Sequence, residues 1–199
     1  GCSNSSGSRI YFPPCNADFV LCLDVEKEVV EQIGLPIPGD SKFLAGGVSM
    51  QFQKRIYFAP YNAPRVLCVD SEQATVWEIG DASQAPGKYE SDGVLEPRSG
   101  CAYFAPCSAD RVLRINADGT NTCEMGPVLP GTSKYRGGSV LAPATGCIYV
   151  PPSNALQMLC IDTSSESVEA VGPRLNHGDK YRAGGVLSPN ANSICFAPH

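Results

Sequence analysis

Hydrophobic residues in this chain fall into short runs that are separated by turns. In residues 47–92, one extended run begins at Gly47–Val48, and others cover Ile56–Pro60, Arg65–Asp70 and Thr75–Gly80. Short apolar runs bounded by Pro, Gly, Asn and Ser predict β-strands. No segment shows the 3.6-residue period of an amphipathic helix. We therefore expect an all-β protein with four strands in this unit.

The unit recurs every 46 residues, with no insertion or deletion between copies. Its clearest mark is a strand that ends in Pro, found at Ile10–Pro14, Ile56–Pro60, Ala102–Pro106, Ile148–Pro152 and Ile194–Pro198. A fixed period of this size is typical of solenoids and propellers. Four strands per unit and a Pro/Gly-rich connection to the next unit favour the blades of a β-propeller. We expect a single β-propeller domain, or a segment of one, with repeats 1–46, 47–92, 93–138 and 139–184 and a partial repeat 185–199.

The fourth copy also carries a family resemblance. It reads Ile148-Tyr149-Val150, then Asn154-Ala155, then a strand that ends at Asp162, and a final β-rich stretch that ends at Gly172. This order resembles the YVTN and NHL-like propeller repeats over nearly the whole chain. The sequence departs from them in an insertion with Lys-Tyr and Gly-Gly-Val-Leu before each first strand. The resemblance implies the fold and leaves function open, because such propellers serve unrelated roles.

Two arrangements are possible for the ends of the array. In a closed four-bladed ring, Val186–Leu187 would replace the opening Gly1–Asn4 as a first strand. Ile194–Phe196 would then compete with Ile10–Phe12 for one place. The sequence therefore favours a piece of a longer propeller, because the fifth repeat is started and left unfinished.

Charge and composition exclude several classes of protein. The formal net charge is −5, which argues against a nucleic-acid-binding surface. No apolar run approaches 18 residues, so we expect no transmembrane segment. The opening residues do not resemble a signal peptide, and the cellular compartment is unknown. No pattern with zinc spacing is present, so no metal and no cofactor are expected. Most of the ten cysteines are expected to be free thiols, because several hold buried-strand positions.

A second sequence feature that recurs in every repeat supplies the best candidate ligand site. A Lys followed by an aromatic residue precedes each first strand, and Arg follows in two copies. The candidate residues are Lys42, Lys88, Tyr89, Lys134, Tyr135, Arg136, Lys180, Tyr181 and Arg182. Cations beside aromatic faces suit an acidic peptide, a phosphate or a sugar acid. The alternative, which we favour, is that each pair fastens one blade to the next, with the Lys stem lying over the aromatic ring.

Two further candidates are places where the copies differ. Glu96 stands where Ala142 and Ser188 occur, on the innermost strand, and is expected to direct a carboxylate toward the channel. Trp77 is the only Trp and lies on an outer strand, where it is either a partner contact or a cover for the sheet edge.

Signals for catalysis are scarce. The two histidines, His177 and His199, stand in no motif with a nucleophile, and no phosphate-cradling Gly loop opens a helix. We therefore expect a non-catalytic propeller that acts as a protein-interaction scaffold or accessory subunit of a larger assembly. The alternative is a propeller that binds an anionic ligand or a glycan on the Lys-aromatic rim, and a propeller enzyme is less favoured.

Overall fold

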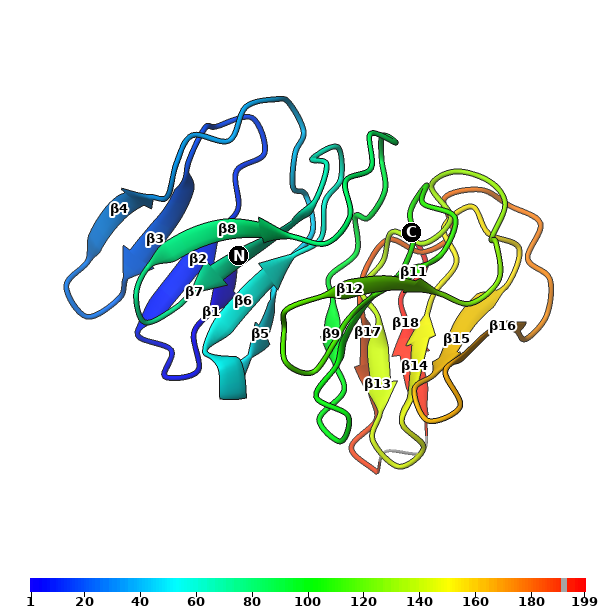
Figure 1. Ribbon diagram of the computed structural model, residues 1–199. Helices are drawn as coiled ribbons and strands as arrows, with labels where there is room; N and C mark the ends of the chain where they lie inside the picture. The colour runs from blue at the N-terminus through cyan, green and yellow to red at the C-terminus, as the bar shows by residue number, and fades with distance from the viewer. Residues whose placement is uncertain (191–192) are drawn as a thin grey trace.

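The computed structural model describes residues 1–190 and 193–199 and is nearly all-β (Figure 1). Four antiparallel sheets of four strands follow one another along the chain, and a sheet of two strands comes last. We call them blades 1 to 5.

Blade 1 contains β1 (Cys2–Ser3), β2 (Arg9–Phe12), β3 (Val20–Asp24) and β4 (Val29–Ile33). Blade 2 contains β5 (Val48–Met50), β6 (Arg55–Phe58), β7 (Val66–Asp70) and β8 (Thr75–Ile79), with the short 3-10 helix η1 (Gln51–Gln53) between its first two strands. Blade 3 contains β9 (Val94–Leu95), β10 (Ala102–Phe104), β11 (Val112–Ile115) and β12 (Thr122–Met125). Blade 4 contains β13 (Val140–Ala142), β14 (Cys147–Val150), β15 (Met158–Asp162) and β16 (Ser167–Val171), and blade 5 contains β17 (Gly185–Leu187) and β18 (Ile194–Phe196).

This architecture confirms the predicted propeller of 46-residue, four-stranded blades. Within a blade the strands pair in chain order, and the register repeats: Tyr57 pairs with Cys68 in blade 2, and Tyr149 pairs with Cys160 in blade 4. Residues separated by a whole number of repeats therefore occupy equivalent places in their sheets.

The turn between the third and fourth strands is set by a short polar side chain. In blade 2 the Asp70 carboxylate accepts hydrogen bonds from the backbone N–H groups of Glu72 and Gln73, at 2.9 and 2.8 Å. Asp162 holds Ser164 and Ser165 in the same way. A short acceptor side chain can satisfy such turn N–H groups, because it reaches its own backbone two and three residues ahead.

Gly80, the glycine that ends the fourth strand of blade 2, is needed for two reasons. Gly80 has a φ of +82°, a conformation that residues with a side chain rarely adopt. In addition, a Cβ atom at Gly80 would lie 2.2 Å from the Oγ1 atom of Thr122 in the next blade. The outer edges of blades 2 and 3 can approach each other because position 80 has no side chain.

The hydrophobic core consists of the layers between blades. Tyr57, Val66 and Cys68 of blade 2 pack in one cluster with Phe104 and Leu113 of blade 3. Equivalent clusters join blade 1 to blade 2 and blade 3 to blade 4. Blades 2 and 3 therefore bury both faces of their sheets, which explains the continuous apolar runs in their third strands.

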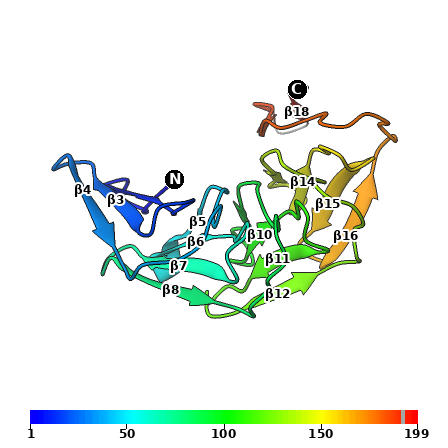
Figure 2. The same cartoon turned by 90° about the horizontal axis from the view of Figure 1, so that it is seen from above.

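The arc of blades does not close into a ring (Figure 2). One face of blade 1 has no blade against it: Phe12 is 41% exposed, whereas the equivalent Phe58 and Phe104 are fully buried. Leu21 is 37% exposed, while Leu67 is fully buried. The closed four-bladed ring is thus not the arrangement of this structure.

The two strands of blade 5 cover blade 4 only in part. Two cavities of about 320 and 330 Å³ lie beside blade 4, and both are lined by Met158 and Phe196. Tyr181, which is equivalent to the buried Tyr89 and Tyr135, is only half-buried.

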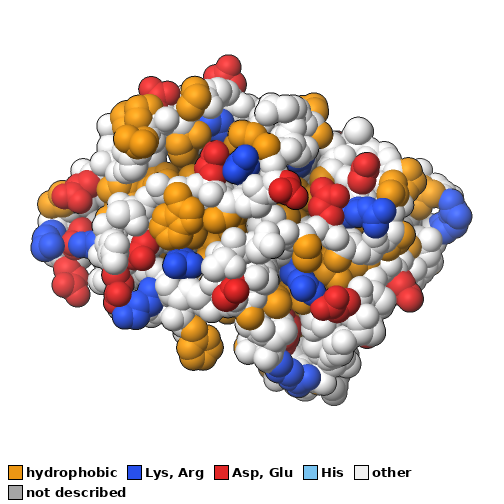
Figure 3. Space-filling view, in the orientation of Figure 1, with side chains coloured by type: hydrophobic (Ala, Val, Ile, Leu, Met, Phe, Trp, Pro, Cys, Tyr) orange, Lys and Arg blue, Asp and Glu red, His pale blue; other side chains and the backbone are white. Residues whose placement is uncertain are grey.

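The surface over the outer strands mixes charged side chains of both signs with hydrophobic ones (Figure 3). Within the part of the chain that the structure describes, no helix is long and apolar enough to cross a membrane.

Candidate functional site

Two loops of each blade meet on one rim of the arc. The loop between the second and third strands lies against the connection from the fourth strand to the next blade. The backbone N–H of Lys42 donates to the carbonyl of Cys15 at 3.0 Å, and the N–H of Tyr61 donates to the carbonyl of Lys42 at 2.8 Å. Each connection therefore joins the loops of two successive blades.

The lysines of this rim are buried and bound to backbone carbonyls. Lys42, Lys88 and Lys134 are only 1%, 4% and 2% exposed. The Nζ atom of Lys134 donates to the carbonyls of Ala109 and Gly131, both at 2.8 Å. Burial lowers the pKa of Lys88 and of Lys134, because it disfavours the charged form.

The other lysines make the same kind of contact. Lys42 binds the carbonyls of Ala17 and Gly39, Lys88 binds those of Ser83 and Ala85, and Lys180 binds that of His177. The three innermost ammonium groups are thus occupied within the loops.

The aromatic partners lie in the same loop layer. The hydroxyl groups of Tyr89 and Tyr135 donate to the carbonyls of Arg111 and Gln157, each at 3.3 Å. Burial raises the pKa of Tyr135 to about 12. These contacts favour the fastening role that the sequence left open as an alternative.

The residue directly after each Lys-aromatic pair behaves differently, and we call it the variable rim position. It is Leu44, Glu90, Arg136 or Arg182 in the four copies. The side chains of Glu90, Arg136 and Arg182 remain 21%, 24% and 38% exposed. This position changes from apolar to acidic to basic, while the aromatic residue before it is buried in the first three copies.

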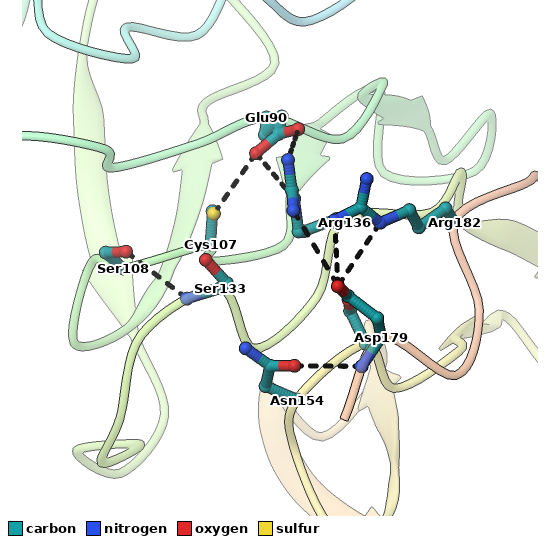
Figure 4. A network of polar contacts seen from close by, with 9 residues as sticks. Glu90, Cys107, Ser108, Ser133, Arg136, Asn154, Asp179 and Arg182 are labelled. Atoms are coloured by element: carbon teal, nitrogen blue, oxygen red, sulfur yellow. Dashed lines mark hydrogen bonds and ion pairs between the residues drawn. The ribbon is translucent and has the colours of Figure 1, made fainter. Parts of the chain in front are cut away.

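Three of these residues form a charged cluster with Asp179 (Figure 4). Arg136 binds Glu90 through two hydrogen bonds, from Nε to Oε2 at 2.9 Å and from Nη2 to Oε1 at 2.7 Å. Its Nη1 atom lies 3.8 Å from Oδ1 of Asp179. The same Oδ1 accepts from Arg182, at 3.2 Å from Nε and 2.9 Å from Nη2. We call Glu90, Arg136, Asp179 and Arg182 the charged cluster, and it spans three successive connections between blades.

Two small polar groups from the facing loops complete the cluster. The buried hydroxyl of Ser153 lies 3.3 Å from Oδ1 of Asp179, and the buried thiol of Cys107 lies 3.5 Å from Oε2 of Glu90. Desolvation and the Glu90 carboxylate raise the pKa of Cys107, so this thiol stays protonated near neutral pH. The hydrogen bonds from Arg182 hold the pKa of Asp179 below its usual value, although desolvation opposes them.

A hollow adjoins the cluster on the side of blade 5. Its volume is about 540 Å³, and its lining includes Asp179, Lys180, Tyr181 and both histidines, His177 and His199. Asp179 therefore borders both the two guanidinium groups and this open space.

The remaining sequence candidates lie away from the cluster. Glu96 is 3% exposed, and its carboxylate accepts hydrogen bonds from the backbone N–H groups of Arg98 and Ser99 at 3.1 and 2.7 Å, within its own turn. Trp77 is half-buried, with the Arg55 guanidinium 5.3 Å from the centre of its ring. The guanidinium lies over one face of the indole, as in a cation–π contact.

Sequence reasoning found Arg136 and Arg182 and missed the acidic half of the cluster. Glu90 and Asp179 were detectable, because each is the only carboxylate at its repeat position. The lysines are the charged residues that recur in all four copies, and recurrence therefore favoured them instead. Among the described residues, no group of three or more His, Cys, Asp or Glu side chains has the arrangement of a metal site, and all ten cysteines are free thiols.

Similarity to known proteins shows the fold of this chain alone. No known protein family and no curated protein sequence matches the chain. Among solved structures, it is similar to virginiamycin B lyase from Staphylococcus aureus, with a TM-score of 0.71 and 16% identity over 100% of this chain and 68% of the lyase. It is similar to Kuenenia stuttgartiensis hydrazine synthase, with a TM-score of 0.70 and 14% identity over 98% of this chain and 54% of that one. An auxiliary nutrient binding protein from Bacteroides thetaiotaomicron gives a TM-score of 0.65 and 14% identity over 98% of this chain and 55% of that one. The chain has a β-propeller fold. The narrower resemblance to YVTN and NHL-like repeats stays a prediction.

These similarities correct the function expected from the sequence. We expected a non-catalytic scaffold or accessory subunit, because catalytic motifs were scarce. Two of the similar structures, a lyase and a synthase, are enzymes by name. The inference from missing motifs was wrong, because one fold hosts many unrelated functions and enzymes occur among the similar propellers.

Proposed function

We propose that this propeller binds a small polar molecule, as a ligand or a substrate, at the charged cluster. The observation that carries the proposal is the variable rim position, where Glu90, Arg136 and Arg182 stand in successive blades. In a repeat protein, residues shared by all copies serve packing, whereas binding residues concentrate in loops that differ. This site is distinct from the lysines, whose ammonium groups are bound to carbonyls.

The chemistry of the cluster favours a ligand with an anionic group. Arginine presents a planar set of N–H donors that matches the two oxygens of a carboxylate or phosphate. Arg182 is the more exposed of the two arginines, at 38%, and it binds Asp179, which lines the 540 Å³ hollow. The hollow offers space for the rest of the molecule. The nutrient binding protein among the similar structures is compatible with small-molecule binding by such a fold.

A binding screen with paired variants tests the proposal. Succinate, inorganic phosphate and glucuronate are added to the protein, and binding is followed by NMR chemical shifts and thermal stability. At least one probe should bind, and Arg182→Ala should weaken that binding at least tenfold. The control is Arg65→Ala, which removes an exposed arginine directly before β7 in blade 2. Equal binding by the Arg182 and Arg65 variants, or no binding of any probe, contradicts the proposal.

A further inference from the structure

Asp179 differs from the rest of the charged cluster, because residues with other side chains adopt the same backbone conformation at its repeat position. The equivalent residues in the other copies are Ser41, Gly87 and Ser133. All four have a left-handed backbone, with φ between +48° and +66°. Three different residue types thus adopt the same backbone conformation.

A separate contact holds this loop in place. The backbone N–H of Asp179 donates to Oδ1 of Asn154 at 3.0 Å, as Ser41 does to Asn16 at 2.7 Å and Gly87 to Asn62 at 2.9 Å. The loop geometry is therefore set by the main chain and its partner across the rim. The Asp179 carboxylate is an addition that only this copy carries.

That carboxylate places one oxygen at the point where the donors of the cluster converge. Its Oδ1 atom contacts Nε and Nη2 of Arg182, Nη1 of Arg136 and the buried hydroxyl of Ser153. The Asp179 side chain is 52% exposed, whereas that of Arg136 is 24% exposed. The acid thus lies over the arginines from the solvent side rather than beneath them.

We infer that the ligand of this site carries a carboxylate, and that the Asp179 side chain occupies the position of this group while the site is empty. This inference rests on the proposed function and adds the chemical class of the ligand. An incoming carboxylate would accept hydrogen bonds from Arg182 and Ser153, and Asp179 would turn toward the hollow that it already borders. Glu90 keeps Arg136 in place through its two hydrogen bonds, so the site stays formed during the exchange.

The net charge of the cluster stays the same when a ligand carboxylate replaces the Asp179 side chain. With Asp179 in place the cluster contains two acids and two arginines and is neutral. Displacement of Asp179 leaves one unpaired positive charge, which the ligand neutralises. A side chain that fills the site in at least nine molecules of ten lowers the apparent affinity about tenfold or more, because only the open fraction can bind.

The test compares acetate binding to the wild-type protein, Asp179→Ser and Asp179→Asn. The serine is the residue that Ser41 and Ser133 already place in the same loop, and the asparagine keeps the shape of Asp179. Binding is measured by NMR titration of the arginine Nε–Hε signals. Asp179→Ser should bind acetate at least tenfold more tightly than the wild type. Addition of Arg182→Ala to Asp179→Ser should remove the gain. Asp40→Ser, which deletes an exposed acid from the corresponding connection of blade 1, should leave binding unchanged.

The outcomes separate this inference from the proposed function. If a probe binds wild-type protein through Arg182 but Asp179→Ser gives no gain for acetate, the site stands and the inference is wrong. If phosphate gains as much as acetate, the site accepts any oxyanion and the carboxylate class is overturned. If neither aspartate variant binds acetate while both keep the wild-type melting temperature, the inference fails as well. If both variants unfold, Asp179 is a structural ion-pair partner, which also refutes it.

Discussion

Phe12 and Phe58 hold the same repeat position on equivalent strands, yet they differ in burial. Phe58 is 0% exposed between blades 1 and 2, whereas Phe12 is 41% exposed on the open face of blade 1. Phe58→Ala and Phe12→Ala therefore make the same chemical change in one fold. We expect Phe58→Ala to lower the free energy of unfolding far more than Phe12→Ala.

The magnitudes follow from burial. Truncation of a fully buried Phe to Ala costs about 3–5 kcal/mol, because transfer free energy is lost and a cavity remains. Complete burial of a Phe side chain stabilises a protein by about 1.5–3 kcal/mol. Phe12 is 59% buried, so Phe12→Ala should lower the free energy of unfolding by about 1–2 kcal/mol. Solvent fills the space that Phe12 leaves, so no cavity cost is added. The two variants should differ by about 2–3 kcal/mol.

Urea unfolding followed by circular dichroism measures this difference. With a slope of roughly 2–3 kcal/mol/M, the midpoint should fall by about 1–2 M for Phe58→Ala and by about 0.5 M for Phe12→Ala. Equal losses would refute the reasoning, because they would mean that Phe12 is buried in solution. Repetition at a tenfold lower protein concentration shows whether a second copy buries it, since only an intermolecular contact depends on concentration.

Three further predictions test other contacts. Lys134→Met keeps the stem and removes the ammonium from two loop carbonyls; the free energy of unfolding in urea should fall by about 1–3 kcal/mol, and unchanged stability would show that water satisfies those carbonyls. Desolvation raises the pKa of Glu96, but the hydrogen bonds that the backbone N–H groups of Ser99 and Arg98 donate outweigh it and lower this pKa in the folded protein. The ionised Glu96 therefore stabilises the fold fully above its ordinary pKa of 4.5. This stabilisation is lost as pH falls through the lower pKa of the folded state. Melting temperatures below pH 4.5 should therefore fall less steeply in Glu96→Gln than in the wild type, and parallel curves would contradict this assignment. Exposed Cys123 should react with iodoacetamide long before buried Cys68, whose pKa desolvation raises to about 12, and mass spectrometry that finds Cys68 labelled first would show that blade 2 opens.

The fold followed from the sequence because packing repeats. Each strand position is used several times against the same neighbours, so an apolar residue at position 58 or 104 reports the same environment. Pro60 after the second strand and Gly80 after the fourth recur for equally local reasons. Periodicity therefore predicted strands and blades together.

Periodicity did not predict the charged cluster, because residues that recur in every repeat are those that serve packing. Lys88 and Lys134 recur since their ammonium groups close loop carbonyls, and recurrence alone could not distinguish this from ligand binding. The cluster depends on which charges face each other across neighbouring connections. That Asp179 meets both Arg136 and Arg182 is a fact of three-dimensional geometry, and the spacing along the chain does not contain it.

The buried Lys-aromatic pairs also bear on how such a protein changes over evolutionary time. Each pair fixes its connection without help from the next residue, which in this chain is Leu, Glu or Arg. A mutation at that residue alters the charge presented to solvent and leaves the contacts of the Lys-aromatic pair in place. Duplication of one 46-residue unit would copy the fastening pair and its adjacent charge together. New binding specificities can therefore arise by recombination of whole blades, with little loss of stability at each step.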